Sequence, residues 1–254
     1  MGEATPELPV VSFSNDRSVA RRGLYVAGFQ PETEASAIAR FARASGFGPI
    51  SVFGPAGPLH ERVRSALSRN GDLQASEPYA AGAVAAGAER LIATLVGRRP
   101  TVTPVVYVVA GPGELAGAAE AIAAASRRYG PVQIAGGAGM AEAVERAPER
   151  LIGAWWAAAD PAIRRSFGDR YRRRYGRAPE RLAGLGYDGA YLAAALASGG
   201  RITPAEVERA NGFLGVDGLF RFAPDGVVER ALAVVQNTPG GAYVLSPAAR
   251  AFPR

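Results

Sequence analysis

Nucleophilic and metal chemistry depend on histidine, cysteine or clustered carboxylates, and this sequence offers few of them. It contains one histidine, His60, and no cysteine. No Gly-x-Ser-x-Gly motif accompanies His60, so the serine hydrolases built on that turn are excluded. No group of His, Asp and Glu residues has the spacing of metal ligands. We interpret His60 as a surface or capping residue and Asp188 as a helix-start residue, and predict neither an enzyme nor a metal site.

A glycine-rich turn at residues 111–117 is the nearest approach to a phosphate-binding loop. It follows an apolar strand and opens a helix, which is the context that a dinucleotide site requires. However, Pro112 lacks a backbone N–H donor, and Glu114 places negative charge where phosphates would lie. The next predicted strand ends at Gly136 without an acidic residue to bind a ribose. The turn therefore predicts a tight connection facing a cleft, and no cofactor.

The basic charge of the chain is concentrated in one segment. The net charge of +6 comes from arginine alone, because the sequence contains no lysine, which is typical of a GC-rich genome. Residues 164–175 are the richest in arginine, and large apolar residues recur every fourth position from Ile163 to Tyr175. This spacing predicts a helix with one apolar face. We interpret its arginines as a solvated face, and predict no nucleic-acid partner.

The composition is that of a globular protein. The chain has 254 residues, of which 48% are hydrophobic and 20% charged. This is enough for one large domain or two lobes of roughly 100–150 residues. No apolar run approaches the ~20 residues of a membrane-spanning helix. The first residues lack the features of a signal peptide, so an export signal is expected upstream of residue 1. Trp155 and Trp156 could stack on a ligand, but they lie in an apolar run, which favours packing in the core or at a lobe interface.

Strand-like and helical runs alternate over the first two thirds of the chain. The predicted strands are residues 9–13, 49–53, 73–79, 103–110 and 132–135, and the predicted helices are 31–45, 59–69, 83–96 and 114–129. This alternation predicts an α/β protein with a parallel sheet covered by helices on both faces.

The pattern changes after residue 156. Helices are predicted at 161–175, at 179–198 and from Thr203, followed by a hairpin of strands 218–222 and 227–236 and a last strand at 242–245. The chain also opens almost directly on an apolar strand. A parallel strand buried on both faces cannot be a bare edge without exposing apolar surface. We therefore expect N-terminal βα units to be missing.

Several segments together resemble the type I periplasmic-binding-protein fold. Residues 8–16 (Leu-Pro-Val-Val-Ser-Phe-Ser-Asn-Asp) resemble its fourth strand and ligand loop, and residues 25–32 its first crossover into the second lobe. Residues 185–192 resemble its return helix. Residues 212–234, with Gly-Val-Asp-Gly-Leu-Phe-Arg-Phe and Pro-Asp-Gly, are similar to the C-terminal hairpin of leucine-binding-protein-like proteins called penicillin-binding protein activators.

The resemblance implies two Rossmann-like lobes joined by three crossovers, with a ligand closed between them. It also implies three further βα units before the first strand. By that reading, residues 1–28 and 158–215 are the remainder of lobe one. Residues 29–157 and 216–254 are lobe two with the C-terminal crossover hairpin.

The resemblance also implies a set of ligand-binding positions. They are the loop residues after the strands of each lobe, namely Ser14, Asn15 and Asp16 in lobe one and Leu59, Gly113 and Gly137 in lobe two. Asp16 would repel the carboxylate of an amino acid. Leu59 stands where an aromatic residue is common in the family, and His60 stands where glycine is usual. These departures favour the activator branch over the transport branch.

The predicted function is therefore a non-catalytic domain of the penicillin-binding protein activator type. It would act in the periplasm by binding a penicillin-binding protein or another envelope protein, with a small-molecule ligand as a further partner. One alternative is a substrate-binding protein of an ABC transporter for branched-chain amino acids or similar solutes. Another is a nucleotide-dependent enzyme that uses the turn at Gly111–Gly113.

Overall fold

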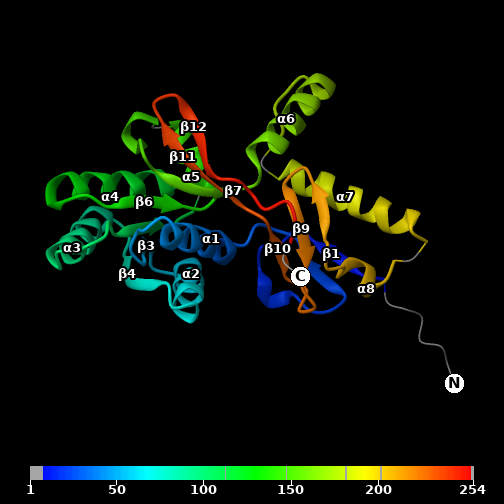
Figure 1. The fold of residues 1–254 in the computed structure, drawn as a ribbon, viewed down its shortest axis with the longest axis horizontal. Coiled ribbons are helices and arrows are strands. Elements are labelled where there is room, and N and C mark those ends of the chain that lie inside the picture. Colours follow the sequence, from blue (N-terminus) through cyan, green and yellow to red (C-terminus); the bar gives the residue numbers. More distant parts are fainter. Residues whose placement is uncertain (1–7, 112, 147, 181, 201, 253–254) are drawn as a thin grey trace. The chain divides into compact units, whose positions relative to one another are not determined.

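Figure 1 shows the fold in a computed structural model, which describes residues 8–111, 113–146, 148–180, 182–200 and 202–252. The chain divides into two compact units. Unit 1 comprises Met1–Gln30, Ala159–Ala233 and Ala248–Arg254, and unit 2 comprises Pro31–Ala158 and Val234–Pro247. Each unit is therefore assembled from segments far apart in the sequence.

Within the described residues, unit 2 is built on a seven-stranded sheet. In spatial order its strands are β12 (Gly241–Ser246), β11 (Ala233–Thr238), β7 (Trp155–Ala158), β6 (Gln133–Gly136), β5 (Val105–Val108), β3 (Ile50–Pro55) and β4 (Leu73–Tyr79). The strands from β7 to β4 pair in parallel, and β11 and β12 pair antiparallel. The connecting helices are α1 (Pro31–Ala44), α2 (Pro58–Arg69), α3 (Val84–Gly97), α4 (Leu115–Tyr129), α5 (Gly139–Arg146) and the 3-10 helix η2 (Pro148–Leu151).

The core of unit 2 forms because its central strands are apolar on both faces. All four residues of β5 are buried, as are Ile50, Val52 and Phe53 of β3. Continuous apolar runs of this kind are typical of parallel strands covered by helices on both sides. Trp155 packs edge-on against Phe41 and Phe47, with ring centroids 5.0 and 4.6 Å apart. The predicted role of this tryptophan in core packing is confirmed.

Of the described residues, those of unit 1 form two small sheets. In one, β1 (Val10–Ser12) pairs in parallel with β2 (Leu24–Val26). The other is antiparallel, in the order β10 (Val228–Arg230), β9 (Gly218–Phe222) and β8 (Phe213–Gly215). Its helices are the 3-10 helix η1 (Arg17–Val19), α6 (Pro161–Tyr175), α7 (Ala183–Ser198) and α8 (Pro204–Val207).

The core of unit 1 is a small aromatic cluster. Tyr25 lies against Phe222, and Phe220 lies between Phe213 and Phe222, with ring centroids 5.2 to 5.9 Å apart. Tyr25 donates a hydrogen bond to Glu208 at 2.7 Å. Burial, with this hydrogen bond as the second cause, raises the pKa of Tyr25 to about 12. The hydroxyl therefore stays a donor at neutral pH and holds the start of the chain to the segment after α8.

The predicted alternation of strands and helices is confirmed, although helix α5 was not predicted and one strand at the C-terminus was predicted wrongly. The hairpin of β9 and β10 is present, with Val228 opposite Phe222. The single strand predicted at 227–236 is wrong, because it is two strands in different sheets. β10 pairs with β9, whereas β11 pairs with β12. The apolar run from Ala231 to Val235 continues across this break, so the local pattern gave no sign of it.

The short strands β2, β7 and β8 were not predicted, since three or four residues are too few to show a period. Among the described residues, none of the helices combines the length and the apolar character needed to cross a membrane.

Candidate functional site

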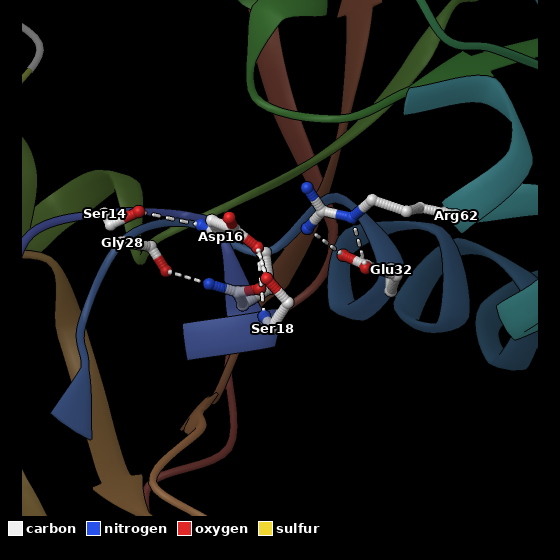
Figure 2. Close-up of polar contacts among 7 residues, drawn as sticks. Ser14, Asp16, Ser18, Gly28, Glu32 and Arg62 are labelled. Atoms are coloured by element: carbon white, nitrogen blue, oxygen red, sulfur yellow. Dashed lines mark hydrogen bonds and ion pairs between the residues drawn. The ribbon is translucent and has the colours of Figure 1, made fainter. Parts of the chain in front are cut away.

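The loop after β1 is held by its own polar side chains. The Ser14 hydroxyl accepts a hydrogen bond from the Asp16 backbone N–H at 3.0 Å (Figure 2). The Asp16 carboxylate accepts from the backbone N–H of Ser18 at 3.0 Å and from its hydroxyl at 2.6 Å, and so caps η1. Asn15 and Asp16 are exposed, and Ser14 is half-buried. Such turns fix the loop and leave an exposed negative charge at its tip.

The segment after β2 adds a buried amide that sequence reasoning missed. Gln30 is 2% exposed, and its Nε2 donates to the Gly28 carbonyl at 3.1 Å. Gly28 in turn donates its N–H to the Ser14 carbonyl at 3.0 Å. No hydrogen bond reaches Gln30 Oε1 within the part of the chain that the structure describes. A Gly-x-Gln sequence offers no distinctive signal, so this acceptor could not have been found from the residues alone.

Unit 2 places its three predicted positions at one edge of its sheet. Leu59 is the second residue of α2, which follows β3, whereas Gly113 follows β5 and Gly137 follows β6 directly. Because β3, β5 and β6 are parallel neighbours, their carboxyl ends meet at the same edge, the usual place for ligand sites in α/β proteins. Leu59 is half-buried and Gly113 is exposed.

Gly137 is buried, and buried acidic residues lie against it. Glu32 and Glu34, in the first turn of α1, are 4% and 8% exposed. A Cβ at Gly137 would collide with the Glu34 carboxylate and lie 2.9 Å from the Tyr107 hydroxyl. Burial, followed by the negative charges of Glu34 and Glu32, raises the pKa of Tyr107 well above its ordinary value. This part of the edge is therefore packed and negatively charged.

One arginine faces these carboxylates. Arg62 on α2 binds Glu32 through two contacts, Nε to Oε1 at 2.8 Å and Nη2 to Oε2 at 3.1 Å (Figure 2). Two parallel N–H···O contacts make a strong and well-oriented pair. The positive end of the α1 dipole also favours acidic residues in this first turn. The guanidinium of Arg62 is thus bound by the Glu32 carboxylate.

His60 of α2 is a further titratable residue of unit 2. It is 4% exposed, and its Nε2 lies 2.8 Å from the Ser76 hydroxyl of β4. Burial lowers its pKa. The interpretation of His60 as a surface or capping residue is wrong, because α2 turns this side chain into unit 2. In a catalytic triad a carboxylate accepts a hydrogen bond from the histidine Nδ1. No group among the described residues hydrogen-bonds His60 Nδ1, so His60 and Ser76 do not form such a triad.

The turn at Gly111 uses its own backbone donors. The N–H groups of Glu114 and Leu115 both donate to the Gly111 carbonyl, at 3.0 and 3.1 Å. Pro112 lies outside the described residues. A phosphate loop needs such N–H groups free at the helix start, so this turn is poorly suited to binding a phosphate. No group of three or more His, Cys, Asp or Glu residues in the described ranges is placed to hold a metal ion.

Unit 1 contains a buried charge cluster, which we define as the buried Asp188, Asp217 and Arg230 together with the partly exposed Arg164 that pairs with Asp217. Asp188 lies inside α7 and not at a helix start, so that interpretation is wrong; α7 begins five residues earlier, at Ala183. Its carboxylate accepts backbone N–H groups of Val216 at 2.6 Å and Asp217 at 3.2 Å. Gly215 leaves the room for it, since a Cβ there would collide with the carboxylate. Asp188 therefore pins the β8–β9 turn to α7.

Two arginines complete the cluster. Arg164 of α6 forms an ion pair with the fully buried Asp217. Arg230 donates to the Ala27 carbonyl at 2.8 Å and lies 5.1 Å from the ring centroids of Phe29 and Phe220. Charges buried at this depth are stable only when paired. The cluster is thus a structural link between α6, α7 and the three-stranded sheet.

The fold is shared with solved binding proteins. No family model matches the chain, and no curated protein matches it. The leucine binding protein LivK of Thermotoga maritima is 18% identical with a TM-score of 0.65, over 94% of this chain and 73% of LivK. A solute binding protein of an ABC transporter from R. palustris, in complex with benzoate, is 19% identical with a TM-score of 0.67, over 97% and 72%.

LpoA of Haemophilus influenzae is a third structure of this kind. It is 18% identical with a TM-score of 0.59, over 96% of this chain and 42% of LpoA. These likenesses confirm the predicted resemblance to the type I periplasmic-binding-protein fold. At such low identities they establish the fold alone.

Proposed function

We propose that this chain is a non-catalytic binding domain of the cell envelope, of the penicillin-binding protein activator type. Its partner would be a penicillin-binding protein or another envelope protein. The proposed cleft positions are Ser14, Asn15 and Asp16 in unit 1 and Leu59, Gly113 and Gly137 in unit 2. Each lies at the carboxyl ends of the strands of its own unit. The likeness to LpoA supports this proposal.

The observation that carries the proposal is the charge at these positions. In unit 1 the Ser14 hydroxyl and the Asp16 carboxylate hold the turn, and the exposed group is an acid. In unit 2 the buried Glu32 and Glu34 occupy the sheet edge, and Arg62 is engaged by Glu32. An amino acid's carboxylate needs positive charge or free N–H donors. At the described positions the exposed charge is that of Asp16, and the nearby cation, Arg62, is bound by Glu32. This charge distribution favours contact with a protein over capture of an amino acid.

A substrate-binding protein of an ABC transporter is the second candidate. It is favoured by the likeness to LivK and to the benzoate complex, of which this chain spans 73% and 72%, against 42% of LpoA. Its solute would be a branched-chain amino acid or a similar small molecule. The two candidates differ in what stabilises the protein, a small solute or a protein partner.

Differential scanning fluorimetry of the full chain against the twenty amino acids and benzoate separates the two candidates. We expect no stabilisation, which corresponds to binding no tighter than roughly millimolar, or ~4 kcal/mol. Surface plasmon resonance with the periplasmic part of a penicillin-binding protein from the same genome should show saturable binding. Stabilisation by one solute, lost in Asn15→Ala, with no binding of the penicillin-binding protein, would establish the transport receptor instead.

A further inference from the structure

An aromatic and arginine-lined pocket lies between α6 and α7. These two helices of unit 1 follow each other in the chain (Figure 1). Its volume is about 360 Å³. It is lined mainly by Phe167, Arg170, Tyr171, Arg174, Tyr175 and Tyr187. Volumes of this size are typical of sites that hold a ligand or an anchoring side chain. We name this feature the α6–α7 pocket.

The rings of the pocket form a continuous row. Phe167 lies 5.4 Å from Tyr187 and 5.8 Å from Tyr171, and Tyr171 lies 4.6 Å from Tyr175, measured between ring centroids. Phe167 is 6% exposed and anchors the row, whereas Tyr187 and Tyr175 are 50% and 62% exposed. The apolar face predicted for this helix is therefore only partly buried, and its outer half is a surface of tyrosine rings.

The pocket is also positively charged. Arg170 and Arg174 line it, so these two arginines lie beside the aromatic row and not on an opposite, solvated face. Arg170 donates to the Ser166 hydroxyl at 3.1 Å. Neither guanidinium has a carboxylate partner among the described residues. The acid of α6, Asp169, is paired with Arg172. Two cations with free charge thus flank an apolar hollow.

We propose that the α6–α7 pocket binds an acidic segment of a protein partner, with an aromatic or large apolar side chain of that segment inserted among the rings. Tyrosine and arginine are the residue types enriched at the energetic centres of protein interfaces. The planar guanidinium groups would bind carboxylates on either side of the inserted side chain. The inference rests on the proposed function, because it takes the partner to be a protein. It adds that the contacting segment of that partner is acidic and carries an aromatic or large apolar side chain.

Fluorescence anisotropy tests the pocket directly. The probe is a short labelled peptide of alternating glutamate and glycine with one central tryptophan, added to the full chain. We expect Arg170→Gln/Arg174→Gln and Tyr187→Ala each to weaken binding about tenfold or more. The matched control is Arg165→Gln/Arg173→Gln, which removes the same charge from α6 at residues outside the pocket, and binding should change less than about threefold. Circular dichroism confirms that each variant is folded.

Peptides with alanine for tryptophan, or lysine for glutamate, should lose binding. Equal weakening by both arginine pairs would overturn the proposal, because net charge alone would then explain it. So would tighter binding, through the same residues, of an oligothymidylate or of vesicles containing anionic lipid. A dimer in sedimentation equilibrium that Tyr187→Ala dissociates would assign the pocket to a second copy of this chain instead.

The same variants separate this inference from the proposed function. If the penicillin-binding protein binds and Arg170→Gln/Arg174→Gln leaves its affinity unchanged, the inference fails and the proposed function stands. If the peptide binds through these residues and the penicillin-binding protein does not bind, the proposed function fails and the pocket stands as a protein-binding site.

Discussion

The two units bury their side chains in different ways. Unit 2 covers a broad parallel sheet, with strands such as β5 buried on both faces. Unit 1 joins two short sheets and two long helices around an aromatic cluster and a buried charge cluster. Large apolar side chains that remain exposed are found mostly in unit 1, among them Leu8, Val10 and Phe13 near its first strand.

This difference shows how the two units gain their stability. Unit 2 depends on apolar area spread over many contacts, which tolerates the loss of one polar pair. Unit 1 depends more on a few specific contacts, such as those of Asp188 with the β8–β9 turn. Elements with fewer buried apolar contacts open at lower free energy. We therefore expect unit 1 to lose hydrogen-exchange protection before unit 2.

The largest effect is expected from breaking the buried charge cluster. Asp217→Ala removes the partner of Arg164 and leaves Arg230 without one of its two acidic neighbours. Losing one member of a buried ion pair costs about 3–5 kcal/mol. The loss should appear in unit 1 by hydrogen-exchange mass spectrometry. The two tryptophans, Trp155 and Trp156, both lie in unit 2, so their fluorescence in urea reports that unit separately.

The control for this variant is Glu89→Ala, which removes an exposed ion pair with Arg128. It should cost less than about 1 kcal/mol. If Asp217→Ala destabilised both units equally, the comparison between them would be wrong, and the chain would unfold as one cooperative body.

A smaller effect is expected at the packed edge of unit 2. Gly137→Ala pushes a methyl group into the Glu34 carboxylate and should cost roughly 1–3 kcal/mol by overpacking. The urea midpoint followed by tryptophan fluorescence measures it. Adding Glu34→Ala should recover part of the loss.

The matched position is Gly113, where no atom lies within 4 Å of an added Cβ. Gly113→Ala should leave stability within about 0.5 kcal/mol. Equal costs at the two glycines would show that Gly137 is not packed against Glu34, and would restore it as an open position of the proposed cleft.

The elements that could be predicted are those with local signals. Helix α6 was predicted with its observed bounds, since its large apolar residues recur every fourth position. In the structure Asp160 caps its start and Gly176, with φ of 70°, ends it. The break between β10 and β11 could not be predicted, since it depends on which distant strand each one pairs with. Local apolar patterns do not indicate which distant strand a given strand pairs with.

The candidate site could likewise be predicted only where it depends on neighbouring residues. Ser14 and Asp16 belong to a turn whose residue types are readable from the sequence. The burial of His60 depends on Ser76, and the role of Asp188 depends on Val216, which lies 28 residues away. Sequence neighbours alone wrongly placed His60 at the surface and Asp188 at a helix start. The ligand role of the six predicted cleft residues stays a prediction.

One buried group in each unit should contribute to the acid response in opposite directions. Burial lowers the pKa of His60 in unit 2 below 6.5, so the unfolded chain binds its proton first as pH falls. Unit 2 therefore loses stability as pH drops below about 6.5. In unit 1, burial raises the pKa of Asp188 above 3.8, so the folded state binds its proton first. That contribution is fully present below pH 3.8 and is lost as pH rises through the raised pKa.

The variants His60→Gln and Asp188→Asn separate these two contributions from other titrating groups. Each is compared with the unaltered chain in urea unfolding between pH 7 and pH 4. His60→Gln should remove part of the acid loss in unit 2, and Asp188→Asn should remove part of the acid gain in unit 1. A pH dependence unchanged by both variants would mean that neither side chain is buried as described.

The smallest effect is expected at the exposed side of β1. Val10 is 56% exposed, whereas Val26 of the neighbouring strand β2 is fully buried. Val10→Thr should change the unfolding free energy by less than about 0.5 kcal/mol, because its side chain already contacts water. Val26→Thr should cost roughly 1–3 kcal/mol, because a hydroxyl is then buried without a partner. Hydrogen exchange in β1 and β2 measures both. If Val10→Thr proved as costly as Val26→Thr, the exposed side of β1 would be buried in solution by another molecule. The larger number of exposed apolar side chains in unit 1 would then be explained in part by a bound partner.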